Sequence, residues 1–230
     1  MKKHYPWLWF DADETLFDYS RAEATALRHA FSSFSLPFED SYLDIYRGIN
    51  QRLWQRLEKR EITPALLRMQ RFELLLEAVQ LSGSPDQMSS TYLEQLGRCA
   101  DLNEGAYEVL QALHRTCQIV IVTNGLSTVQ RGRLALSTIQ PFISELIISE
   151  EIGAAKPHAA FFEIASARTG HPPKSDILLI GDSLTSDMQG GADYGLDTCW
   201  YNPAGKPQPG GLPITYEIRH LRALLNVIKE

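Results

Sequence analysis

The sequence contains few cysteines, and they lie far apart. Cys99, Cys117 and Cys199 are odd in number and match neither a disulfide framework nor the ligand spacing of a zinc site. Scattered reduced thiols are typical of proteins in a reducing compartment, so we expect a cytoplasmic protein.

The sequence also lacks long apolar runs and dense blocks of basic residues. No segment approaches the ~20 apolar residues that a membrane-spanning helix requires. The short apolar run that follows the N-terminal lysines ends at Asp11, which is too early for a signal peptide. The formal net charge is −6, and no stretch is rich in Lys and Arg. We therefore expect neither a membrane nor a nucleic acid polymer as a partner.

The 230 residues have an ordinary globular composition, with 44% hydrophobic and 22% charged residues. Short apolar runs are nearly continuous rather than alternating, as in parallel strands that are covered on both faces. They predict strands at Trp7–Phe10, 118–122, 145–149, 177–180 and 198–201. Helical periodicity occurs between them, at 103–115 and at 157–169, where Pro157 is a candidate first residue and Gly170 a C-terminal cap. Strands that alternate with helices predict an open α/β sheet.

Residues 19–100 interrupt this alternation, because no strand pattern occurs among them. Their periodicity predicts consecutive helices at 21–34, 41–59, 64–81 and 85–99. We interpret this interval as a helical insertion between the first and second strands. Near the end of the chain, residues 202–213 are rich in Gly and Pro and predict a loop, which a final helix over 216–229 would follow.

Polar residues follow the predicted strands at the point where each strand ends. In open α/β sheets, ligands bind outside these carboxyl ends, so the groups should converge on one crevice. In chain order they are Asp11 and Asp13, then Thr123, Asn124 and Gly125, then Lys156, then Asp182 with Asp187.

Each group has a chemical role that suits a phosphate site. Asp11, Asp13 and Asp182 would repel one another without a cation, and hard carboxylate oxygens suit Mg²⁺. Lys156 would neutralise phosphate, and the side chains of Thr123 and Asn124 with the N–H groups near Gly125 would bind its oxygens. Taken singly, each group also has an ordinary explanation as a turn or a solvated residue. The order and placement of the whole set favour the functional interpretation.

This set of residues resembles the motifs of the haloacid dehalogenase superfamily of phosphohydrolases. The resemblance implies a Rossmann-like core domain, residues 1–17 and 101–230, with an inserted all-helical cap, residues 18–100. It implies that Asp11 is the nucleophile, which forms an aspartyl-phosphate, and that Asp13 is the acid–base residue. The other implied roles are phosphate binding by Thr123, charge stabilisation by Lys156, magnesium binding by Asp11, by Asp182 and by the backbone carbonyl of Asp13, and support from Asp187 as a ligand or a neighbour of the ligands.

Two positions narrow the reaction within that superfamily. Its dehalogenases lack the second aspartate of the first motif, so Asp13 favours phosphate chemistry. Its mutases usually carry glycine directly after that aspartate, where this chain has Glu14.

A closer resemblance is to the bacterial pyrimidine 5′-nucleotidase branch. It depends on residues 9–17, 50–54, 62–63, 71–73, 148–153, 155–157 and 199–200. This resemblance implies a nucleoside 5′-monophosphate as the substrate, with pyrimidines favoured. An aromatic side chain of the cap, or Phe17, could cover the flat base.

Other functions remain open from the sequence. One is a phosphatase for another small metabolite such as a sugar phosphate, and another is a non-enzymatic phospho-aspartate switch. Receiver domains, which are such switches, are shorter and carry their acceptor after a middle strand, whereas Asp11 follows the first strand. The chain is expected to be a monomer or a homodimer.

Overall fold

The computed structural model describes residues 3–59, 61–208 and 210–228. The described strands form a six-stranded sheet in the order β3-β2-β1-β4-β5-β6, and all neighbouring strands are parallel. The bounds are β1 (Trp7–Phe10), β2 (Gln118–Thr123), β3 (Glu145–Ile148), β4 (Ile177–Gly181), β5 (Asp197–Tyr201) and β6 (Tyr216–Ile218). The predicted α/β class with a Rossmann-like parallel sheet is confirmed.

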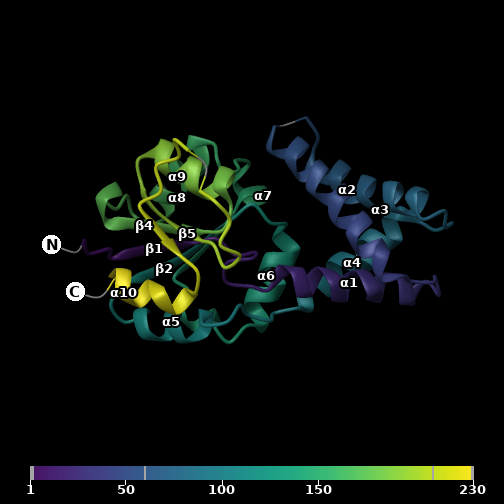
Figure 1. Cartoon of the computed structure of the whole chain (residues 1–230), viewed down its shortest axis with the longest axis horizontal. Coiled ribbons are helices and arrows are strands. Elements are labelled where there is room, and N and C mark those ends of the chain that lie inside the picture. Colours follow the sequence, from purple (N-terminus) through teal and green to yellow (C-terminus); the bar gives the residue numbers. More distant parts are fainter. Residues whose placement is uncertain (1–2, 60, 209, 229–230) are drawn as a thin grey trace.

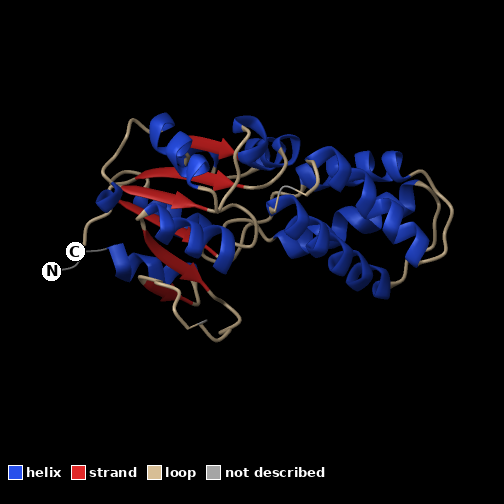
Figure 2. Ribbon diagram, turned by 90° about the horizontal axis from the view of Figure 1, so that it is seen from above, coloured by secondary structure: helices blue, strands red, loops and turns tan. Residues whose placement is uncertain are grey.

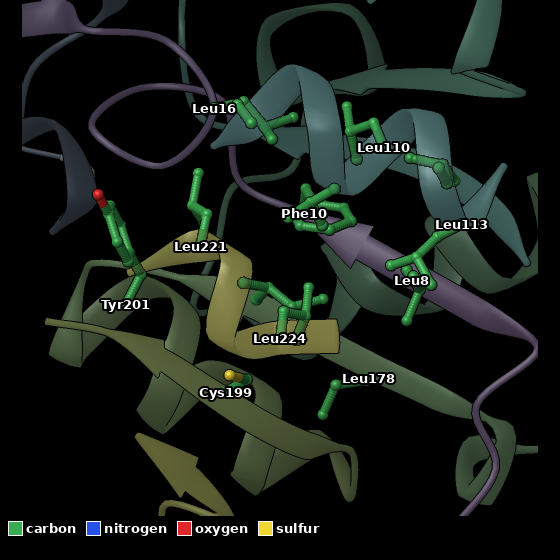
Figure 3. Packing of buried hydrophobic residues seen from close by; sticks show 14 of the residues in the cluster. Leu8, Phe10, Leu16, Leu110, Leu113, Leu178, Cys199, Tyr201, Leu221 and Leu224 are labelled. Atoms are coloured by element: carbon green, nitrogen blue, oxygen red, sulfur yellow. The ribbon is translucent and has the colours of Figure 1, made fainter. Parts of the chain in front are cut away.

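Helices cover both faces of the sheet, which explains why the strand sequences are continuously apolar. On β1, Leu8 and Phe10 point to the face that packs on α5 (Ala106–Leu113) and α10 (Leu224–Ile228), and Figure 3 shows this packing. Trp9 points to the opposite face, in the cluster formed with α8 (Ala159–Arg168) and α9 (Gly190–Tyr194). Alternate residues of a strand face opposite sides, so both sets must be apolar when both sides are covered.

The predicted insertion folds as a separate group of helices, which we call the helical layer. It consists of α1 (Tyr19–Ser33), α2 (Asp40–Glu58), α3 (Pro64–Ala78) and α4 (Pro85–Arg98), each within three residues of its predicted bounds at either end. Asp18, Thr63 and Ser84 cap three of these helices by accepting hydrogen bonds from backbone N–H groups of the first turn. The layer has its own apolar core, and Figures 1 and 2 show it beside the sheet rather than over one of its faces.

Helix α6 (Ser127–Leu136) joins the helical layer to the sheet. Leu126 and Val129 belong to the core of the layer, and Figure 1 shows α6 beside α4 and α1. The two chain segments that connect the layer to the sheet also lie side by side. The N–H of Asp18 donates to the carbonyl of Asp101 at 3.0 Å, and that of Asn103 donates to the carbonyl of Leu16 at 2.9 Å.

The prediction of a single final helix over 216–229 is wrong. Tyr216, Glu217 and Ile218 form β6, the edge strand beside β5, and α10 begins only at Leu224. The helical spacing of Leu221, Leu224 and Ile228 is real, but the preceding residues gain more by completing the sheet. The last residue of the predicted helix lies outside the described part of the chain.

Two other helix boundaries differ from the predictions. Pro157 precedes α8 in a cis peptide bond with Lys156, and the helix begins at Ala159, whereas Gly170 follows its end in the left-handed conformation, as expected of a cap. Helix α5 is shorter than predicted and begins at Ala106. The predicted loop at 202–213 is confirmed over its described residues. The remaining short elements are η1 (Gln140–Phe142), α7 (Ser149–Ile152), η2 (Lys174–Asp176), η3 (Leu184–Gln189) and η4 (Leu221–Ala223).

Candidate active site

Asp11 lies at the carboxyl end of β1, the strand between β2 and β4. Its N–H donates to the carbonyl of Ile180 at 2.8 Å, so the backbone is still held by the sheet at this residue. The chain then leaves the sheet in a tight turn, in which the N–H groups of Leu16 and Phe17 donate to the carbonyl of Ala12. The buried Asp11 carboxylate is therefore fixed at the edge where ligands of such sheets bind.

Lys156 brings the end of β1 together with the loop that follows α7. Its side chain is 1% exposed, and its Nζ donates at 2.7 Å to Asp11 Oδ1, at 2.6 Å to Asp187 Oδ1 and at 2.7 Å to the Val122 carbonyl. An ammonium has three protons, so each of them has a partner here. Lys156 is thus an integral part of the buried site.

The last residue of β2 and the residues that follow it hold Lys156 and shape the neighbouring loop. Asn124 accepts from the Lys156 N–H at 2.9 Å and donates to the Lys156 carbonyl at 2.8 Å. The hydroxyl of Thr123 accepts from the Gly125 N–H at 3.0 Å. Asn124 therefore fixes the backbone of Lys156, and its role as a phosphate ligand stays a prediction, as do those of Thr123 and Gly125.

Asp182 and Asp187 reach the site from the end of β4 and from η3. The N–H of Ser183 donates to Asp187 Oδ2 at 3.2 Å, and the indole of Trp200 donates to the Asp182 carbonyl at 3.0 Å. A side chain at Gly181 could not be accommodated, because its Cβ would lie 2.3 Å from Asp187 Oδ2. The glycine that ends β4 is what allows the buried Asp187 carboxylate to approach the strand.

The cluster carries more negative than positive charge. Among the described residues, Asp11, Asp182 and Asp187 offer carboxylate oxygens that all lie within 4.8 Å of one another, and Lys156 contacts two of these side chains. Burial raises the pKa of Asp11 well above its ordinary value, against the opposing charge of Lys156. Burial and then the charge of Asp187 raise the pKa of Asp182 to about 7.

The same surroundings keep Lys156 protonated. Burial alone would lower the pKa of Lys156, but the charges of Asp11 and Asp187 raise it above its ordinary value. One ammonium cannot balance three carboxylates, and hard oxygen donors that are short of positive charge suit a divalent cation. The residues present therefore fit a magnesium ion.

Asp13 points away from this cluster, toward α6. Its carboxylate accepts from Gln130 Nε2 at 2.7 Å and forms an ion pair with Arg133 Nη1. Any contribution of Asp13 to a metal site would therefore come from its backbone carbonyl, as the resemblance implies. No sequence pattern indicated Gln130 and Arg133. Their spacing of three places them on one face of a helix, but nothing in the sequence indicates that this face meets Asp13.

A pocket of about 260 Å³ unites these groups with side chains of the helical layer. Every predicted site residue lines it except Asp187, which lies buried behind Lys156 and Gly181. The helical layer contributes Tyr19, Asn50, Trp54 and Glu58. The sequence did not single out Glu58, whose pKa is raised by burial and by the charge of Asp187.

Comparison with protein families matches the haloacid dehalogenase-like hydrolase model over residues 7–195. The chain belongs to this family, whose nucleotidase branch the sequence resembled. It is 33% identical to the pyrimidine 5′-nucleotidase YjjG of Escherichia coli, over 96% of each chain. It is also 33% identical to the pyrimidine 5′-nucleotidase PynA of Streptococcus pneumoniae, over 97% of this chain and 95% of the relative.

Among solved structures, the fold is very similar to the HAD-hydrolase YfnB of Bacillus subtilis bound to magnesium. The TM-score is 0.93 at 35% identity, covering 99% of this chain and all of that one. No helix among the described residues is long and apolar enough to cross a membrane.

Proposed function

We propose that this protein is a magnesium-dependent phosphomonoesterase that hydrolyses nucleoside 5′-monophosphates through an aspartyl-phosphate on Asp11. The observation that carries the proposal is the buried Asp11 carboxylate, paired with Lys156 at 2.7 Å inside a pocket that Asp13 and Asp182 also line. Carboxylates act as nucleophiles in phosphoryl transfer, and the charge of Lys156 favours the ionised form of Asp11 against the effect of burial.

In the first step, an oxygen of Asp11 forms a bond to phosphorus as the bond to the leaving alcohol oxygen breaks. Asp13 gives a proton to that oxygen, and the product alcohol leaves. In the second step, Asp13 takes a proton from water, whose oxygen attacks phosphorus, and the bond to Asp11 breaks. Inorganic phosphate is released and both side chains are regenerated.

Lys156 remains protonated in both steps and stabilises the negative charge near phosphorus. The carboxylates of Asp11 and Asp182, with the backbone carbonyl of Asp13, would hold the magnesium ion, and Asp187, whose oxygens lie within 4.8 Å of theirs, would support them. When bound, the ion supplies positive charge to the phosphate oxygens. The magnesium in the YfnB structure, which is 35% identical, supports this choice of metal.

The names of the relatives support a pyrimidine nucleoside monophosphate as the substrate. The half-buried Trp54 lines the same pocket as Asp11 and offers a flat apolar surface that a base could stack on. Phe17 is buried beneath Arg133 and does not line the pocket, so Trp54 is the better candidate.

We also propose that residues 18–100 act as a cap on a core of residues 1–17 and 101–230, and that the cap excludes water during the reaction. Its own apolar core and its contribution to the pocket support this division. A cytoplasmic location is part of the proposal, since Cys99, Cys117 and Cys199 are all buried and unpaired.

The test is phosphate release from a panel of nucleoside 5′-monophosphates and sugar phosphates, with Mg²⁺ and with EDTA. We expect metal-dependent release concentrated on pyrimidine nucleotides, and none from the Asp11→Asn variant. Release concentrated on sugar phosphates would keep the chemistry and reject the substrate. Absence of release from every compound would reject the proposal.

A further inference from the structure

Arg133 is a buried charged residue that touches both connections between the helical layer and the sheet. Its side chain on α6 is completely buried. Its Nε donates to the carbonyl of Cys99 at 2.9 Å, in the connection that leaves the layer. Its guanidinium lies 4.8 Å from the ring centre of Phe17, in the connection that enters the layer, and 5.9 Å from that of Tyr19, the first residue of α1.

The same guanidinium holds the carboxylate of Asp13. Arg133 pairs with Oδ1 of Asp13, and Gln130, one turn earlier on α6, donates to Oδ2 at 2.7 Å. Both carboxylate oxygens thus have a partner on one helix, which fixes the rotation of the group as well as its position. The planar fork of arginine suits this task, because its donors point in fixed directions.

Packing alone does not explain an arginine at this position. Arg133 Nη2 has no hydrogen-bond partner among the described residues, and burying a charged side chain for one ion pair contributes little net stability. Apolar residues of similar volume could fill such a site between Phe17, Tyr19 and α6.

We propose that Arg133 is a positioning residue that sets the orientation of the Asp13 carboxylate and ties it to both connections of the helical layer. The inference depends on the proposed function, in which Asp13 transfers protons. Arginine does not release its own proton at neutral pH, so Arg133 acts only through Asp13. Any shift of the helical layer relative to the sheet must change a contact of Arg133. Through Arg133, such a shift would change the orientation of the Asp13 carboxylate.

This role predicts a dependence on the leaving group. A nucleoside leaves as a strongly basic alkoxide and needs the proton of Asp13, whereas p-nitrophenolate is stable without it. Misplacing Asp13 should therefore slow the departure of a nucleoside much more than that of p-nitrophenolate. A merely structural role would slow both equally.

The test is a single-turnover experiment with enzyme in excess, which measures release of the leaving group in the first step. Arg133→Lys keeps the positive charge but loses the planar guanidinium group. Arg133→Met keeps much of the side-chain volume but loses the charge. For both variants we expect nucleoside release from a monophosphate to slow ~10- to 100-fold and p-nitrophenolate release to slow less than ~3-fold. Arg131→Gln is the matched control, because Arg131 lies on the same helix and pairs with Glu151 at the surface.

The melting temperature identifies variants that fail to fold. If Arg133→Met does not fold, Arg133→Lys alone decides the test. Equal slowing of both leaving groups, or wild-type rates, would overturn the inference. Asp13→Asn distinguishes a failure of the role of Arg133 from a failure of the proposed acid–base role of Asp13. If it slows nucleoside release selectively and the Arg133 variants do not, only the role of Arg133 fails. If Asp13→Asn has no selective effect, the proposed acid–base role fails, and the inference with it.

Discussion

Lys156 is the residue on which the charge balance of the site depends. It is the cation that the structure places between Asp11 and Asp187. The side chain of Asn124 holds its backbone through hydrogen bonds to both the N–H and the carbonyl of Lys156. A buried ion pair of this kind adds little stability when intact, but its loss leaves carboxylates without compensation.

Replacing Lys156 with methionine should therefore impair both folding and catalysis. We expect the free energy of unfolding to fall by about 3–5 kcal/mol, because the buried carboxylates lose their partner. Urea denaturation measures this loss, and the exposed Lys59→Met serves as the matched control. Unchanged stability of Lys156→Met would show that the carboxylates are not charged together in the folded protein.

Asp182 predicts how the stability of the metal-free protein depends on pH. Its pKa is raised from 3.8 to about 7, mainly by burial, so the folded state favours the protonated form more than the unfolded state does. Its contribution to stability is therefore fully present below 3.8 and is lost as the pH rises through about 7. In EDTA, urea denaturation should show this loss, and Asp182→Asn should reduce it. Added Mg²⁺ should restore stability at high pH, since the ion binds the ionised form.

At the scale of elements, α6 carries much of the contact between the helical layer and the sheet. Gly132 on α6 faces Gly97 on α4, and a Cβ at Gly132 would lie 2.8 Å from the Gly97 carbonyl oxygen. The absence of a side chain at Gly132 lets the two backbones approach closely. The same helix presents Gln130 and Arg133 to Asp13.

Gly132→Ala should push α4 away from α6. We expect a loss of about 1–3 kcal/mol in the free energy of unfolding, as is typical when extra atoms are forced into a packed interface. Gly48→Ala is the control, because this position inside α2 has room for a methyl group. That substitution should be neutral or stabilise by up to about 1 kcal/mol. An unchanged stability of Gly132→Ala would mean that the two helices separate without cost.

The sequence predicted those elements whose local pattern agrees with their place in the fold. The apolar run of β1 and the capped helices α3 and α4 are of this kind. β6 was missed because a three-residue edge strand has too short a pattern to compete with the helical spacing that follows it. Asp11, Lys156 and Asp182 were found because strand ends converge by topology.

Other features of the site depend on contacts between distant segments. The pairing of Asp13 with Arg133 joins residues 120 positions apart, and no local pattern marks it. The pairing of Asn124 with the Lys156 backbone is likewise a tertiary contact, although both residues were singled out. A sequence can thus indicate which residues meet at a strand end, but not which way each side chain turns.

At the scale of the whole molecule, two groups of elements with separate apolar cores enclose the pocket around Asp11. The strand ends of the sheet supply the aspartates and Lys156, and the helical layer supplies Asn50, Trp54 and Glu58. Figure 2 shows how few segments cross between them. This arrangement suits an enzyme in which one part carries the chemistry and the other reads the leaving group.

The most direct test of the account is to identify the phosphorylated residue during turnover. The enzyme is mixed with substrate and Mg²⁺, quenched in acid and treated with borohydride, which reduces an aspartyl-phosphate to homoserine. Mass spectrometry should find homoserine at position 11, only when substrate is present. Phosphate release without modification of Asp11, or with modification of another carboxylate, would contradict the account.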